Sequence, residues 1–148
     1  MNILFVCHGN ICRSPMAEFI LKELVRKAGM ESRFHIASAA TSGEELGNPL
    51  YPPARQTLAA HGIPCSSHAA RQITKEDYST FDLIIGMDEQ NRKNLLRFFD
   101  GDPEGKISLL LDHTPTPGPV ADPWYTGDFE AAWRDISRGC RALLAELS

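Results

Sequence analysis

One eight-residue segment, CHGNICRS at positions 7–14, constrains the fold and function of this chain more than any other. It follows the apolar run Ile3–Val6, which is typical of a buried parallel strand. It precedes Pro15, and proline suits the first turn of a helix because its missing N–H has no intrahelical partner there. The segment is therefore predicted to form a tight loop between a strand and the N-terminus of a helix.

The predicted loop has the properties of a phosphate-binding site. Backbone N–H groups at a helix N-terminus can converge on one oxyanion, and Arg13 adds a planar guanidinium group that can bind two phosphate oxygens. A nucleotide-binding loop would instead read Gly-x-x-x-x-Gly-Lys-Ser/Thr and would need no cysteine. The predicted phosphate-binding residues are His8, Gly9, Asn10, Ile11, Cys12 and Arg13.

Cys7 is the candidate nucleophile, because it begins the loop in which the phosphate would be held. The helix N-terminus and Arg13 both favour its thiolate form, and Ser14 can donate its hydroxyl to the sulfur. Gly9 and Asn10 suit the left-handed backbone conformations that a tight loop requires. The alternative is a buried structural cysteine beside a surface arginine. That alternative leaves unexplained why glycine, asparagine, serine and proline all fall where the loop needs them.

A phosphate ester also needs a proton donor for its leaving oxygen, and Asp122 is the candidate. It lies in the loop after the last predicted strand, so it should reach the same edge of the sheet as Cys7. The neighbouring Trp124 and Tyr125 can line a pocket for an aryl group. Asp-Pro is also a common turn dipeptide, so the dipeptide alone leaves a purely structural role for Asp122 open.

The pattern Cys-x-Gly-Asn-x-Cys-Arg-Ser-Pro, directly after a strand, resembles the low-molecular-weight protein tyrosine phosphatases of the bacterial type. The Asp-Pro-aromatic triplet matches that family's acid motif, and the resemblance covers nearly the whole chain. It implies hydrolysis of phosphotyrosine in proteins, and of small aryl phosphates, through a phosphocysteine on Cys7. Arg13 and the loop amides would bind the phosphate, and Asp122 would act as general acid and then as general base. No cofactor and no metal ion are implied.

The same resemblance assigns further roles. His68 lies in a stretch like the family's Ala-His-x-Ala-Arg, whose histidine supports the loop asparagine, here Asn10. Cys7 and Cys12 correspond to two cysteines that form a reversible, protective disulfide. The other supporting residue is Ser14.

The long loop between positions 41 and 53 departs from the family. Glu44 and Glu45 stand where relatives often carry an aromatic residue on one wall of the substrate cleft, and Tyr51 is the only aromatic residue nearby. A carboxylate there either favours a basic residue near the phosphotyrosine or is simply a solvated loop charge. This departure leaves open which substrates are preferred, but it does not change the predicted reaction. The predicted substrate wall consists of Ile11, Glu44, Trp124 and Tyr125.

Strand and helix patterns alternate along the chain. This predicts a single-domain α/β fold over residues 1–148, with a four-stranded parallel sheet and helices on both faces. Beyond the first strand, the predicted strands span 34–38, 81–85 and 106–111. The predicted helices start near position 16 and span 54–61, 88–99 and 129–147, with Asp88 as a helix cap.

Composition narrows the class of partner. The net charge of −4 offers no basic surface for nucleic acid, and no apolar run approaches the ~20 residues of a membrane span. The opening strand leaves no room for a signal peptide, so we expect a cytoplasmic protein with four reduced cysteines and no zinc site. The expected partner is a phosphotyrosine-containing protein, with a tyrosine kinase as one candidate, and phosphate-like oxyanions should inhibit.

Three alternative functions share the loop. An arsenate reductase of the same fold would pass oxidation to further cysteines after the third strand, but no cysteine lies between positions 65 and 140. A protein-arginine phosphatase tends to carry threonine in place of Ile11. A catalytically inactive phosphate-binding module, or a pure redox sensor, would have no need to retain Cys7, Arg13 and Asp122 together.

Overall fold

The computed structural model describes all 148 residues and is built on one four-stranded sheet in which every pair of neighbouring strands is parallel. The strands are β1 (Asn2–Cys7), β2 (His35–Ala40), β3 (Leu83–Gly86) and β4 (Ile107–Leu109), in the order β2-β1-β3-β4. The predicted fold class is confirmed.

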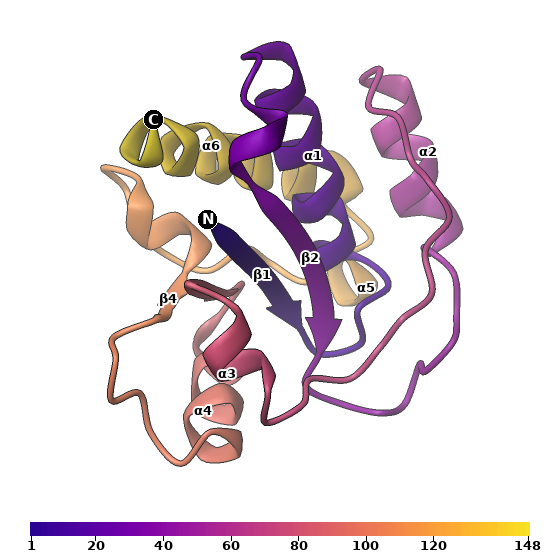
Figure 1. Ribbon diagram of the computed structural model, residues 1–148. Helices are drawn as coiled ribbons and strands as arrows, with labels where there is room; N and C mark the ends of the chain where they lie inside the picture. The colour runs from indigo at the N-terminus through magenta and orange to yellow at the C-terminus, as the bar shows by residue number, and fades with distance from the viewer.

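Helices cover both faces of the sheet. One face carries α1 (Arg13–Lys27) and α6 (Phe129–Leu147), with α2 (Pro52–Ala60) beside them, while α3 (Asp77–Thr80) and α4 (Glu89–Phe98) lie on the other (Figure 1). None of these helices is both long and apolar enough to cross a membrane. The remaining elements are the 3₁₀ turns η1 (Glu31–Arg33) and η2 (Leu110–His113) and the short helix α5 (Pro123–Thr126).

Strand β1, which is buried from Ile3 to Cys7, separates the two layers of the core. Its side chains alternate between the faces, as strand geometry requires. Ile3 and Phe5 belong to the larger apolar cluster, which includes residues of α1 and α6, whereas Leu4 and Val6 belong to the smaller cluster with Leu95 of α4. A strand that is buried on both faces reads as a continuous apolar run, which is why positions 3–6 gave a clear signal.

The strand order fixes where a ligand can bind. The chain passes from β1 to its neighbour β2 on one side and later continues through β3 and β4 on the other. The loops that follow β1 and β3 therefore diverge at the carboxyl edge and open a crevice between them, which is the usual ligand site of such sheets. The loop at positions 8–12 begins at this crevice.

The fourth strand is shorter than predicted. The apolar pattern predicts a strand over residues 106–111, but β4 ends at Leu109 and the chain continues as η2. The carboxylate of Asp112 accepts a hydrogen bond from the backbone N–H of Leu109 at 3.0 Å, which turns the chain at that point. Leu110 and Leu111 stay buried from within the turn, so the apolar pattern persists although the strand does not.

Candidate active site

The loop between β1 and α1 is held in shape by Asn10, which is fully buried and has a left-handed backbone with φ of 59°. Its side-chain amide donates to the hydroxyls of Ser14 at 2.8 Å and Ser38 at 2.9 Å. Its side-chain oxygen accepts from the backbone N–H of Arg71 at 3.2 Å. Nε2 of His68 lies 2.7 Å from the backbone carbonyl oxygen of Asn10. His68 therefore contacts the main chain of the loop asparagine, and not its side chain.

The sulfur of Cys7 lies at the end of this network. The hydroxyl oxygen of Ser14 is 3.0 Å from Sγ of Cys7, and the backbone N–H of Ser14 donates to the same sulfur at 3.4 Å. Because the Ser14 oxygen already accepts from Asn10, its own proton is free to point at the sulfur. Two hydrogen-bond donors therefore converge on this one sulfur.

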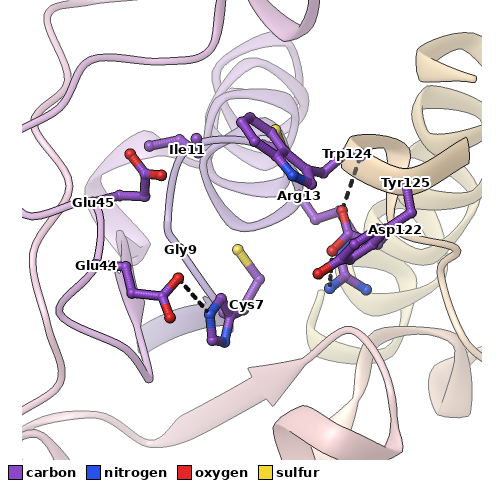
Figure 2. Close-up of a pocket in the computed structure, with 11 residues that line it drawn as sticks. Cys7, Gly9, Ile11, Arg13, Glu44, Glu45, Asp122, Trp124 and Tyr125 are labelled. Carbon is purple, nitrogen blue, oxygen red and sulfur yellow. Dashed lines mark hydrogen bonds and ion pairs between the residues drawn. The ribbon is translucent and has the colours of Figure 1, made fainter. Parts of the chain in front are cut away.

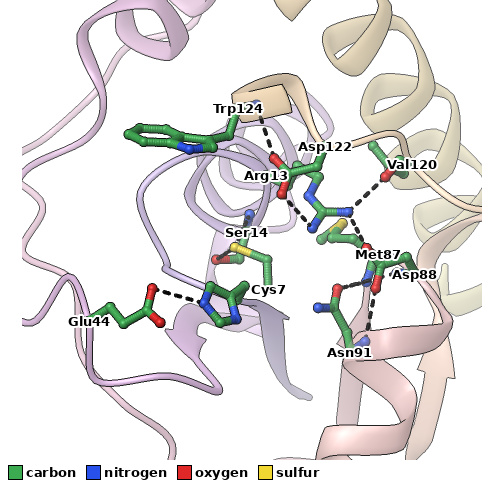
Figure 3. Close-up of polar contacts among 11 residues, drawn as sticks. Cys7, Arg13, Ser14, Glu44, Met87, Asp88, Asn91, Val120, Asp122 and Trp124 are labelled. Atoms are coloured by element: carbon green, nitrogen blue, oxygen red, sulfur yellow. Dashed lines mark hydrogen bonds and ion pairs between the residues drawn. The ribbon is translucent and has the colours of Figure 1, made fainter. Parts of the chain in front are cut away.

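Arg13 opens helix α1 and is only 3 % exposed, and Figure 3 shows its polar contacts. Its Nη1 donates to the Asp88 carboxylate and to the carbonyl oxygen of Val120, both at 2.8 Å, and its Nη2 lies 3.4 Å from the Asp122 carboxylate. Burial lowers the pKa of Arg13, but the negative groups at Cys7, Asp88 and Asp122 outweigh this and raise the pKa above its ordinary value. The guanidinium therefore stays charged and fixed in orientation.

Asp122 joins this group from the loop after β4. It caps the short helix α5, because Oδ1 accepts from the backbone N–H of Trp124 at 3.1 Å while Oδ2 faces Arg13. Trp124 and Tyr125 follow it, and Tyr125 is 84 % exposed. The ring of Tyr51 packs against Trp124 with centroids 4.9 Å apart, and the Tyr51 N–H donates to the Ile11 carbonyl at 2.9 Å. Tyr51 thus links this wall to the loop.

These elements enclose a cavity of about 130 Å³ above the sulfur of Cys7 (Figure 2). Asn10, Ser14 and His68 do not line it, but support the loop from behind. Its lining residues are Cys7, His8, Gly9, Ile11, Cys12, Arg13, Glu44, Glu45, Asp122, Trp124 and Tyr125.

Cys12 is the second sulfur of the cavity. Burial, with additional contributions from the charges of Cys7, Asp122 and Glu45, raises the pKa of Cys12 to about 12. All four cysteines of the chain are free thiols in the structure.

No group of three histidine, cysteine, aspartate or glutamate side chains is arranged to hold a metal ion.

Sequence reasoning missed three contributors to this site. Asp88 was predicted only as a helix cap, a role it fills by accepting from the Asn91 N–H at 2.9 Å, while its other oxygen holds Arg13. Tyr51 was noted only as a nearby aromatic residue, and Glu45 was not predicted as part of the substrate wall. The position of Asp88 just after β3, at the same edge of the sheet as Cys7, was the one available signal.

Comparison with known proteins gives a consistent result. The family model "Low molecular weight phosphotyrosine protein phosphatase" matches residues 2–148. The human protein of that name is 44 % identical over an alignment of 148 positions, and the alignment covers 97 % of this chain and 93 % of the relative. The crystal structure of YfkJ from Bacillus subtilis superposes with a TM-score of 0.96 at 39 % identity, covering 99 % of this chain and 94 % of that one. A structure of the drosophila arginine phosphatase DARP gives a TM-score of 0.88 at 31 % identity, covering 100 % and 98 %.

We predict that iodoacetate alkylates Cys7 before the other cysteines at neutral pH. The Cys7 sulfur has two hydrogen-bond donors and faces the cavity, whereas burial keeps Cys12 and Cys140 protonated by raising their pKa values. Tandem mass spectrometry of peptides sampled over time measures each rate, with the half-buried Cys65 as internal reference. Inorganic phosphate should slow the Cys7 reaction and leave the rate of Cys65, which lies outside the cavity, unchanged. Labelling of Cys12 as fast as Cys7 would contradict this assignment.

Proposed function

The chain belongs to the low molecular weight phosphotyrosine protein phosphatase family and is therefore a protein-tyrosine phosphatase, and we propose that it hydrolyses its substrates through a phosphocysteine on Cys7. The substrates are phosphotyrosine in proteins and small aryl phosphates. The observation that carries this proposal is the shared cavity, in which a sulfur with two donors, a buried guanidinium and a carboxylate lie together.

Phosphate binding is the first step. Nη1 of Arg13 is already held by Asp88 and Val120 and one N–H of Nη2 faces Asp122, which leaves Nε and the second N–H of Nη2 to donate to two phosphate oxygens. The backbone N–H groups of residues 8–12, at the N-terminus of α1, supply the remaining donors. These groups are fixed before the substrate arrives, so they stabilise the charge on the equatorial oxygens without reorganising during the reaction.

Transfer of the phosphoryl group follows. The Cys7 thiolate forms a bond to phosphorus while the bond from phosphorus to the phenolic oxygen breaks, and Asp122 gives its proton to that oxygen. Oδ2 of Asp122 lies 3.4 Å from Nη2 of Arg13, so the acid stands beside the guanidinium that binds the phosphate. Water then attacks the phosphocysteine, Asp122 takes a proton from that water, and the hydroxyl of Ser14 stabilises the departing thiolate.

Replacement of the nucleophile tests the proposal. Wild type should hydrolyse para-nitrophenyl phosphate without added metal and in the presence of a chelator, whereas Cys7→Ser should lose turnover but still bind inorganic phosphate. The measurement is steady-state hydrolysis together with calorimetric phosphate binding. Substantial turnover by Cys7→Ser, or loss of wild-type activity in the chelator, would refute the mechanism. A wild type that binds phosphate without turning over any ester would point to a binding module.

We predict that Asp122→Ala slows hydrolysis by roughly 10²–10⁴ and that the loss grows as the leaving group becomes poorer. A good leaving group hardly needs a proton, so it is affected least. The matched control is Asp128→Ala, which removes the nearby N-cap of α6 but no group of the cavity. Rates across a series of substituted phenyl phosphates make the comparison. Equal losses for all phenols would remove Asp122 from the role of acid.

Ile11 is proposed to set the preference for an aryl substrate, since this buried branched side chain lines the cavity beside the phosphate site. It can pack on a phenyl ring, but it offers no acceptor to the N–H groups of a phosphoguanidinium. Wild type should therefore turn over phosphotyrosine peptides much faster than phosphoarginine peptides, with phosphoserine also poor because its stem is short.

Ile11→Thr should narrow the difference in rate between phosphotyrosine and phosphoarginine peptides, and Ile11→Val is the control that keeps the site apolar. Matched peptides give kcat/KM for each variant. An unchanged preference in Ile11→Thr would show that this side chain does not set it.

Oxidation is proposed to join the two sulfurs of the cavity. A peroxide would oxidise the Cys7 thiolate to a sulfenic acid, which would condense with the Cys12 thiol to form a disulfide and release water. Both sulfurs line the same cavity, and the raised pKa of Cys12 keeps it from competing as the first target. A thiol reductant would restore the enzyme.

The proposed partner is a phosphotyrosine-containing protein, such as a tyrosine kinase, and phosphate-like oxyanions should inhibit by occupying the loop. We also propose that the enzyme acts in the cytoplasm, since its four cysteines are free thiols and the two that line the cavity must be reduced for activity.

A further inference from the structure

One carboxylate on the cavity wall has no cationic partner. Glu45 is half-buried and lines the cavity, and its only side-chain hydrogen bond is with the neutral amide of Asn48, at 2.6 Å. Its neighbour Glu44 differs, because it is 70 % exposed and lies 3.1 Å from Nε2 of His8. The charge of Glu45 is therefore only partly solvated and is not neutralised within the protein.

Packing fixes Glu45 against the phosphate-binding loop. A Cβ atom added to Gly9 would lie 3.3 Å from Cγ of Glu45, so the stem of the glutamate rests where Gly9 has no side chain. The segment that carries Glu45 is tied at both ends, since Ser42 N–H donates to the His8 carbonyl at 3.1 Å and Gly47 N–H to the Ala70 carbonyl at 2.8 Å. The carboxylate therefore has a defined place beside the phosphate site.

Charge is unevenly distributed within the cavity. Glu44 and Glu45 lie on one side of Cys7 and Asp122 on the other (Figure 2). Arg13 is the only arginine or lysine that lines the cavity, and it is buried and occupied by the phosphate in the proposed mechanism. Above the phosphate, the wall is therefore acidic. It should repel a substrate whose phosphotyrosine is flanked by acidic residues and attract one that brings a cation.

We propose that Glu45 selects phosphotyrosine that has a lysine or arginine next to it in the substrate protein. This inference rests on the proposed function and names the substrate class of the same site. A cationic side chain beside the phosphotyrosine would pair with the free oxygen of Glu45. Because the partner is a half-buried carboxylate at a fixed place, the attraction is less screened than between two charges in open solvent. Glu44, already in contact with His8, contributes less.

Three phosphotyrosine peptides of equal length test this, with lysine, glutamine or glutamate on both sides of the phosphotyrosine. In wild type, kcat/KM should fall in that order, with steps of roughly 1.5- to 5-fold for each charge that contacts the wall. The ratio of the lysine to the glutamate peptide should shrink at high salt. Glu45→Gln should bring the ratio close to one, and Glu45→Lys should invert it, with each variant normalised to its own rate on para-nitrophenyl phosphate.

Two further variants serve as references. Glu104→Gln removes a carboxylate just before β4, at the opposite edge of the sheet, and should leave the ratio as in wild type. Glu44→Gln should lower the ratio less than Glu45→Gln does. The proposal would be overturned by equal rates on the three peptides in wild type, or by a ratio that Glu45→Gln does not change. Its assignment to Glu45 would be overturned if Glu44→Gln lowered the ratio as much as Glu45→Gln does. Failure to hydrolyse any of the peptides would count instead against the proposed function.

Discussion

The site depends on a single buried cation. Withdrawing the guanidinium of Arg13 from water is costly unless its hydrogen bonds are met, and the protein meets them with the Asp88 carboxylate and the Val120 carbonyl. Those partners come from the loop after β3 and the loop after β4, whereas Arg13 follows β1. One side chain therefore holds three loops together at the carboxyl edge of the sheet. Asp122 lies in the same loop as Val120 and faces Nη2 of the same guanidinium.

A second constraint is the polar network under the loop. Asn10 adopts a left-handed backbone, which costs free energy for a residue other than glycine. Its buried amide group is satisfied by Ser14, Ser38 and Arg71, and Ser38 in turn donates to Glu18 at 2.6 Å. A network whose members all have partners is rigid and offsets the strain. The network therefore holds the loop between β1 and α1 in one shape.

The features that sequence could predict are those with local signals. The strand before the loop, the loop itself and the aspartate of the Asp-Pro dipeptide each follow from residues next to one another. The ion pair between Arg13 and Asp88 joins positions far apart in the chain, and no spacing rule connects them. The packing of Tyr51 on Trp124 is also long-range and became visible only in three dimensions. The end of β4 was misplaced because Leu110 and Leu111 are buried in η2 as they would be in a strand.

The residues of the cavity are of two kinds, according to whether they lie at its floor or on its walls. At the floor of the cavity, Arg13 and Ser14, which contacts the sulfur of Cys7, each have more than one hydrogen-bond partner. A substitution there leaves buried polar groups unpaired and disturbs the chemistry. On its walls, Trp124 and Tyr125 are exposed and Glu45 has one neutral partner. A wall residue can therefore be substituted without leaving a polar group at the floor of the cavity unpaired. The same fold can therefore keep one reaction while residues of the cavity wall select different substrates, and in this chain we propose that Glu45 makes that selection.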